Sequence, residues 1–196
     1  RRSNVRSRLH PRAGVLRVAL MDGTYYDVQI AHETIDAQGH WSISGHAQTR
    51  LGPQAMVLTY GERAVFGTLP LPDGRVLQVR TEHGRPRIGS HLNFAAPRVT
   101  LDKVQVDTLP PVAQDTGPRV DSNDIAGSKV YDDGTIVIRV LGVYTDDLLA
   151  LRDNDAIATE FASMLAIANQ AHVDSLSPVY FENAGLVAAG TVYASN

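Results

Sequence analysis

The clearest hydrophobic pattern in the chain lies between residues 135 and 172. Residues 135–144 form a β-branched apolar run that only Arg139 interrupts. Such a run is typical of a strand covered on both faces, as in a parallel sheet. After Asp153 the spacing of apolar residues predicts an amphipathic helix. These residues are Ile157, Phe161, Leu165 and Ala168. With a second short strand near 178–181, the pattern indicates a βαβ unit.

Residues 13–90 show a different pattern, in which short runs of Val, Leu, Ile and Tyr alternate with turn signals. In several runs apolar and polar residues alternate, as in Leu77 and Val79 beside Gln78 and Arg80. This alternation predicts antiparallel strands with one buried and one solvated face, in a meander or a sandwich. The turn signals are Asp22-Gly23, Gln38-Gly39, Gly52-Pro53, Pro72-Asp73-Gly74 and Gly84.

Residues 101–128 are rich in Pro, Gly, Ser and Asp and predict a connection between two modules. The modules would be residues 1–100, which are β-rich, and residues 129–196, which contain the βαβ unit and a third strand at 186–193. The fold class expected is α+β, with an antiparallel β-rich module followed by an incomplete α/β half-domain. About 70 residues are few for a parallel strand pair that needs cover on both faces. We therefore expect the sequence to be part of a longer protein or one piece of a cleaved one.

Charge is distributed unevenly over the 196 residues, whose formal net charge is −3. Residues 1–100 contain 13 Lys and Arg against 7 Asp and Glu, a net +6, whereas residues 101–196 contain 5 against 14, a net −9. Opposite fields favour docking of the two modules, and the alternative is two unrelated surfaces. The arginines form no stripe with aromatic residues, so nucleic-acid binding is not expected. No apolar run approaches the roughly 20 residues of a membrane span.

Candidate chemistry is sparse. There is no cysteine, which excludes disulfides, thiolate zinc sites and a cysteine nucleophile. His32-Glu33 begins like a zinc-protease helix, but Asp36 stands where the second histidine is required, and the segment alternates like a strand. Neither a phosphate-binding loop nor a serine nucleophile elbow is present. The other histidines are expected to be surface or hydrogen-bonded structural residues. They are His10, His46, His83, His91 and His172.

Acidic residues gather at the turns and helix starts of the second module. They could bind calcium, or they could cap helices and line solvated loops. These residues are Asp132, Asp133, Asp146, Asp147, Asp153 and Asp155. The chain contains no complete catalytic constellation.

Several strings carry a family resemblance. VIRVLGVYTDDLLA, IANQAHVDS and PVYFENAGLV resemble the start of a reprolysin-like (metzincin) catalytic domain, as found in bacterial secreted zinc metalloendopeptidases of the peptidyl-Asp type. Tyr144-Thr145 matches the end of the first strand of that pattern. VLTYGERAVFGTLPLPDGRVLQVRTEHG is similar to the propeptides that precede such domains. Further matching positions are Asn169, Gln170, Ala171 and Ser175.

The resemblance implies a zymogen, with a latency-conferring prodomain at 1–100 and the N-terminal portion of the catalytic domain at 129–196. Peptide bonds would be hydrolysed by zinc-activated water, and the zinc signature HExxHxxGxxH is expected beyond this chain, so no catalytic residue is assigned here. The cysteine that often blocks zinc in such propeptides is absent. By position, the candidates for that role are Asp102, Asp107 and His91.

The resemblance also implies activation by a cut near residues 110–129 and a secreted or periplasmic location. Its partners would be the C-terminal remainder of the protease, in the same or a cleaved chain, and protein substrates. Two other functions stay open. One is a non-enzymatic binding or adhesion module built on a metzincin-like half-domain, and the other is a free-standing inhibitor of a partner protease.

Overall fold

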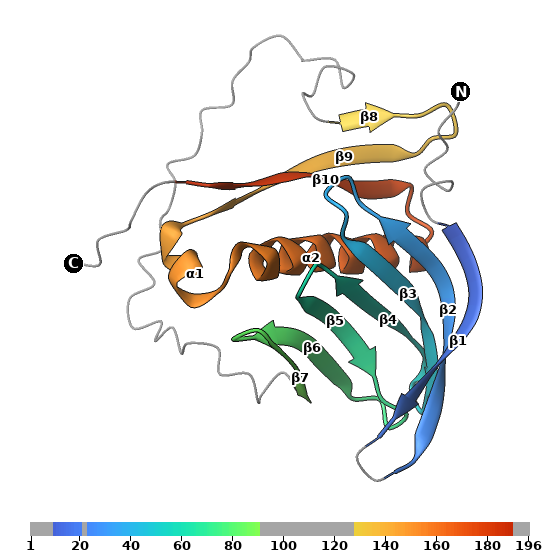
Figure 1. Cartoon of the computed structure of the whole chain (residues 1–196). Coiled ribbons are helices and arrows are strands. Elements are labelled where there is room, and N and C mark those ends of the chain that lie inside the picture. Colours follow the sequence, from blue (N-terminus) through green and yellow to red (C-terminus); the bar gives the residue numbers. More distant parts are fainter. Residues whose placement is uncertain (1–9, 21–22, 91–127, 190–196) are drawn as a thin grey trace, which may run out of the picture.

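A computed structural model describes residues 10–20, 23–90 and 128–189 and has an α+β fold (Figure 1). Seven antiparallel strands form a curled sheet in chain order, and three further strands form a small sheet in the order β10-β9-β8. The first sheet contains β1 (His10–Ala19), β2 (Tyr25–Ile35), β3 (Trp41–Thr49), β4 (Gly52–Tyr60), β5 (Val65–Pro70), β6 (Val76–Glu82) and β7 (Arg85–Ser90). The rest are β8 (Ser128–Val130), β9 (Ile136–Tyr144), α1 (Asp146–Leu151), α2 (Asn154–Asp174) and β10 (Val179–Ala188).

The predicted α+β class and the antiparallel meander are confirmed. The turn residues explain why the sequence predicts the meander. In the β2–β3 turn, the Asp36 carboxylate accepts the backbone N–H groups of Gln38 and His40, and Gly39 adopts a φ of 90°. Left-handed backbone of this kind favours glycine because a Cβ is disfavoured there. Strands β7 and β8 and helix α1 were not predicted.

The seven-stranded sheet has a hydrophobic core of its own. Trp41 stacks on its cross-strand neighbour Tyr60 with ring centroids 5.1 Å apart, and both rings pack against this core. The buried residues of this cluster come from five strands, all within residues 28–79. They are Val28, Ile43, Ala47, Met56, Leu58, Leu69 and Val79. This cluster includes no residue of helix α2 or of the small sheet, so its burial stabilises the seven-stranded sheet by itself.

The other side of β3 and β4 is more polar, although it includes the buried Val57. Ser42 and Thr59 pair across these strands through their hydroxyl groups at 2.8 Å, and both are buried. Helix α2 packs against β4, β5 and the neighbouring part of β3, and also against β10 (Figure 1). The helix therefore lies between the two sheets.

The predicted βαβ unit is confirmed. Strands β9 and β10 are parallel, with Val179 opposite Ile136 and Ala188 opposite Tyr144. Helix α2 begins after Asp153, whose carboxylate accepts the N–H of Ala156 at 2.8 Å. Residues 186–188 were predicted to begin a third strand, but they continue β10 beyond an irregularity that interrupts its pairing with β9.

The expectation that β9 is covered on both faces is wrong for the described residues. Val137 is buried, whereas Leu141 and Val143 are 55% and 65% exposed, and Val187 on β10 is 51% exposed. The helix covers one face of the small sheet, and the described elements leave these three side chains on the surface. Among the described residues, no helix is both long and apolar enough to cross a membrane.

The predicted connection at 101–128 lies outside the described residues, apart from Ser128, which begins β8. The proposed module boundaries therefore stay a prediction.

Candidate functional site

The main candidate for a functional site is the interface between the seven-stranded sheet and helix α2. At the start of the helix, the Asp155 carboxylate accepts two backbone N–H groups from the β4–β5 turn. Glu62 N lies 2.9 Å from Oδ1, and Arg63 N lies 2.8 Å from Oδ2. The Arg63 guanidinium is also 3.9 Å from the Asp153 carboxylate. Because hydrogen bonds to a carboxylate are stronger than neutral ones, this turn anchors the helix.

Gly61 brings the same turn into close contact with the helix. A Cβ placed on Gly61 would lie 2.0 Å from Thr159 Oγ1 and 2.7 Å from Asp155 Oδ1. Thr159 has no exposed surface, and its hydroxyl donates to the Asp155 carbonyl at 2.6 Å. No side chain fits between the turn and the helix at this point, so glycine is required for the approach.

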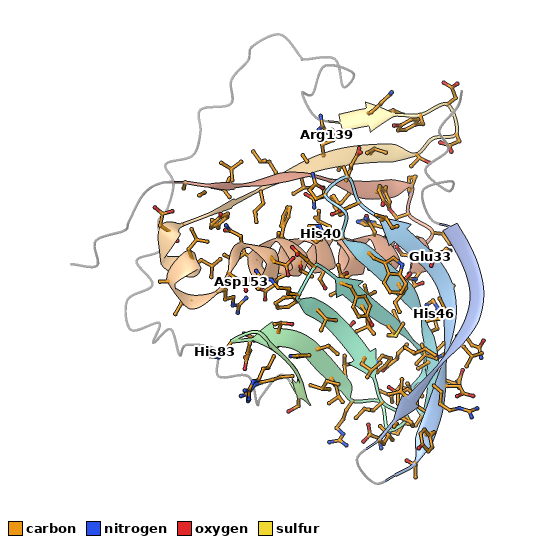
Figure 2. All side chains as sticks on the ribbon, in the orientation of Figure 1. Glu33, His40, His46, His83, Arg139 and Asp153 are labelled. Atoms are coloured by element: carbon orange, nitrogen blue, oxygen red, sulfur yellow. The ribbon has the colours of Figure 1, made fainter. Side chains whose placement is uncertain are left out.

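A second contact joins the β2–β3 turn to β10. The Asn183 amide donates to Asp36 Oδ2 at 2.7 Å, and the His40 ring lies 2.9 Å from the same oxygen. The irregular pairing of β10 falls between Asn183 and Gly185, where Asn183 also accepts the N–H of Gly185. Bulges commonly redirect side chains in this way. Figure 2 shows His40 near the centre of the molecule, at the level of helix α2.

The charges of His40 and Asp36 at this contact depend on pH. The hydrogen bond to Asp36 raises the pKa of His40, although burial opposes this, and the Asp36 and Asp155 charges add to it. Burial opposes ionisation of Asp36, but hydrogen bonds from His40 and Asn183 outweigh it, so the pKa of Asp36 is lowered. The His40 contribution to stability is therefore present below about pH 6.5 and lost as pH rises through the raised pKa. The Asp36 contribution is lost only as pH falls through its lowered pKa.

We expect the free energy of unfolding to fall between pH 6 and pH 9 by roughly 1 kcal/mol more in the wild type than in His40→Gln. Urea unfolding at the two pH values measures the difference. His32 titrates in the opposite sense, because burial and then the nearby His46 lower its pKa. The contribution of His32 to the free energy of unfolding is present in both the wild type and His40→Gln, so it cancels when the two are compared. Identical pH dependences would contradict the assigned role of His40.

A third contact lies at the end of the helix. His46 Nε2 is 3.0 Å from Asp174 Oδ1, and Gln170 donates to the same oxygen at 2.7 Å. Within the described part of the chain, the buried Nδ1 of His32 has no hydrogen-bond partner. His46 was expected to be a surface or hydrogen-bonded structural residue, and it contacts the Asp174 carboxylate, as His40 contacts that of Asp36. The pairing of these histidines with Asp36 and Asp174 was not predicted.

The helix face with the most deeply buried residues differs from the predicted apolar stripe. Ile157 is buried, and Phe161 lies against Gly142 of β9, but Leu165 and Ala168 are only partly buried. Most of the buried helix residues are small or polar. They are Ala156, Ile157, Thr159, Ala162, Ser163, Asn169 and Gln170. The buried apolar cluster that joins the sheet to the helix consists of Ala64, Phe66 and Ala156.

A cavity of about 460 Å³ remains between the end of β2, helix α2 and β10. Two of its polar side chains are already satisfied. Asn169 accepts the N–H of Phe181 at 2.7 Å and donates to the Phe181 carbonyl at 2.8 Å. Asp36 is held by His40 and Asn183, as described above. Asn169 thus joins helix α2 to β10, whereas Asp36 joins the β2–β3 turn to β10.

The positions that carried the family resemblance have structural roles here. Asn169 pairs with the β10 backbone, Gln170 supports Asp174, and the Ser175 hydroxyl donates to the carbonyl of Ala171 at the end of the helix. None of these side chains forms a group able to hold a metal ion, and no such group of His, Asp and Glu occurs elsewhere among residues 10–20, 23–90 and 128–189.

Three of the candidate calcium ligands make hydrogen bonds in turns and at a helix start. Asp133 accepts the N–H of Thr135 within its own turn, Asp153 caps α2, and Asp155 binds the β4–β5 turn. The zinc-blocking candidates Asp102, Asp107 and His91 lie outside the described residues.

Comparisons of the chain with protein-family models, with curated proteins and with solved structures find no match. The resemblance to metzincins and their propeptides rests on the strings quoted above.

Proposed function

We propose that the chain is the latency-conferring propeptide, followed by the N-terminal catalytic segment, of a secreted or periplasmic zinc metalloendopeptidase of the peptidyl-Asp type. The observation that carries the proposal is the interface around helix α2. A sheet with its own hydrophobic core holds a helix of the following module mainly through small and polar residues. Interfaces of this kind resemble those of domains that move apart.

The contacts suit a propeptide that binds specifically and is later removed. In two of the three contacts a carboxylate of the second module meets the first, namely Asp155 with Asp153 at the β4–β5 turn and Asp174 at His46. In the other contact the carboxylate is Asp36 of the first module, which accepts from Asn183. The direction of the Asp155 and Asp174 contacts agrees with the predicted docking of a basic module on an acidic one. The buried apolar cluster that joins sheet and helix has three members, Ala64, Phe66 and Ala156.

Zinc would supply the chemistry by polarising the scissile carbonyl and activating water. The described residues do not form a set of zinc ligands, so we assign no catalytic step to them. In this proposal the ligands and the catalytic glutamate belong to later sequence, and Asp102, Asp107 or His91 blocks the metal in the zymogen.

The test is to produce the protein encoded with roughly the next hundred codons and to follow its processing. We expect an HExxHxxGxxH motif in that sequence, bound zinc by metal analysis, and casein hydrolysis that rises when the chain is cut between residues 110 and 129. A chelator should abolish the hydrolysis. If the motif, zinc and hydrolysis are all absent, the proposal is wrong, and an adhesion module or a free-standing inhibitor takes its place.

A further inference from the structure

The β4–β5 turn has the features of a preformed receptor for a carboxylate. Its two donors are the backbone N–H groups of Glu62 and Arg63, which bind opposite oxygens of Asp155 at 2.9 and 2.8 Å. The turn is closed by a hydrogen bond from Gly61 N to the Ala64 carbonyl at 2.9 Å. Because the donors are backbone groups of a closed hairpin, their arrangement does not depend on the side chain of Glu62.

The β4–β5 turn also restricts the side chain at position 159, which follows Asp155 by one turn of the helix. Asp155 and Thr159 are four positions apart and share one face of the helix. A Cβ on Gly61 would lie 2.0 Å from Thr159 Oγ1. The turn therefore accepts a helix start that carries an aspartate followed four residues later by a small side chain, and it excludes a bulky one.

The far end of the helix sets its direction and register. Asp174 follows Asp155 by 19 residues, which corresponds to roughly 28 Å along a helix, and it meets His46 at 3.0 Å. The sheet thus contacts one aspartate near each end of the helix. A helix docked in reverse, or shifted by one turn, would lose at least one of these contacts.

We propose that, once the connection between the modules is cut, the seven-stranded sheet of one chain captures helix α2 of a second copy of this chain, and that the turn at residues 61–63 recognises Asp155 and Thr159. The contacts that carry this recognition join residues 46–63 to residues 155–174, and any other copy presents the same surfaces. The inference rests on the proposed function only for the cut between the modules. The recognition of the helix itself requires no proteolytic activity.

The experiment uses two forms of the full chain, one with an affinity tag at its N-terminus and one labelled with ¹⁵N. Both carry a site for a specific protease within residues 101–128, and both are cut. The two are mixed and incubated until the composition is constant, and the tagged fragment is then captured. Mass spectrometry measures the ¹⁵N-labelled C-terminal fragment, which contains residues 129–196, bound to it. We expect the wild-type labelled fragment to be captured.

Asp155→Asn in the labelled copy is expected to lower capture by roughly tenfold or more, since it removes the negative charge and replaces one of the two acceptor oxygens with an NH2 donor. Gly61→Ala in the tagged copy should lower capture by a similar factor. These two substitutions lie in different fragments, so misfolding of one fragment cannot explain both losses. Glu62→Ala in the tagged copy is the matched control and should leave capture unchanged, because Glu62 contributes only its backbone N–H to the contact with Asp155.

Absence of the labelled wild-type fragment from the captured material would overturn the inference, and so would equal capture of the wild-type and Asp155→Asn fragments. The readout does not depend on proteolysis. An inactive, zinc-free protein that shows selective capture would overturn the proposed function alone, and an active protease without capture would overturn only this inference.

Discussion

Gly61→Val should release helix α2 from the sheet and lower the free energy of unfolding by about 3 kcal/mol. A Cβ at this position would lie 2.0 Å from Thr159 Oγ1 and 2.7 Å from Asp155 Oδ1. Thr159 is fully buried and cannot turn away. Moving the turn outward instead would break both hydrogen bonds to the Asp155 carboxylate. Overpacking and the lost charge-assisted bonds therefore act together.

Two measurements check this expectation. Urea unfolding gives the change in stability, and amide hydrogen exchange should become at least tenfold faster in residues 154–174 while the core strands stay protected. Gly14→Val is the matched control, because a Cβ on Gly14 of β1 would meet only Ile30 Cβ at 4.0 Å. Equal destabilisation by the two substitutions would contradict the assigned role of the β4–β5 turn.

Asn169→Leu should destabilise the second module by about 3 kcal/mol, although leucine has a similar volume. The buried Asn169 amide pairs with both the N–H and the carbonyl of Phe181, as a neighbouring strand would. Leucine would leave both backbone groups without this partner, and each unsatisfied buried group costs about 1–3 kcal/mol. Hydrogen exchange should accelerate in β10.

Gln170→Leu is the comparison for this substitution. Gln170 is equally buried, but its amide donates one hydrogen bond, to Asp174, which keeps its contact with His46. We expect a loss of about 1 kcal/mol, measured by the same urea titration. If the two variants are equally stable, Asn169 does not support the edge of β10.

The family resemblance and the interface bear on different parts of the proposal. The resemblance pointed to positions such as Asn169 and Ser175, which hold the end of helix α2 and strand β10 in place. In this structure these side chains make local hydrogen bonds to backbone groups. The interface supports the idea of a separable module. Activity of the complete protein decides between a propeptide and the alternatives.

Local sequence determined most of the secondary structure. Alternating residues and Asp-Gly or Pro-Asp-Gly turns predicted the meander, because strand periodicity and turn chemistry depend on neighbouring residues. The strand before Tyr144, the helix start at Asp153 and the strand after Pro178 followed from the same kind of signal. Helix α1 was missed because its six residues are too few to show a helical period.

The interface was decided only by the tertiary structure. Its contacts join residues far apart in the chain, as in Glu62 with Asp155 or Asp36 with Asn183, and no local pattern records such pairs. The helix face toward the larger sheet is made mostly of small and polar residues, which give no hydrophobic signal. The need for glycine at position 61 arises from the approach of Thr159, nearly a hundred residues later. The sequence alone thus determined the two sets of elements, and packing of α2 between the sheets determined how they meet.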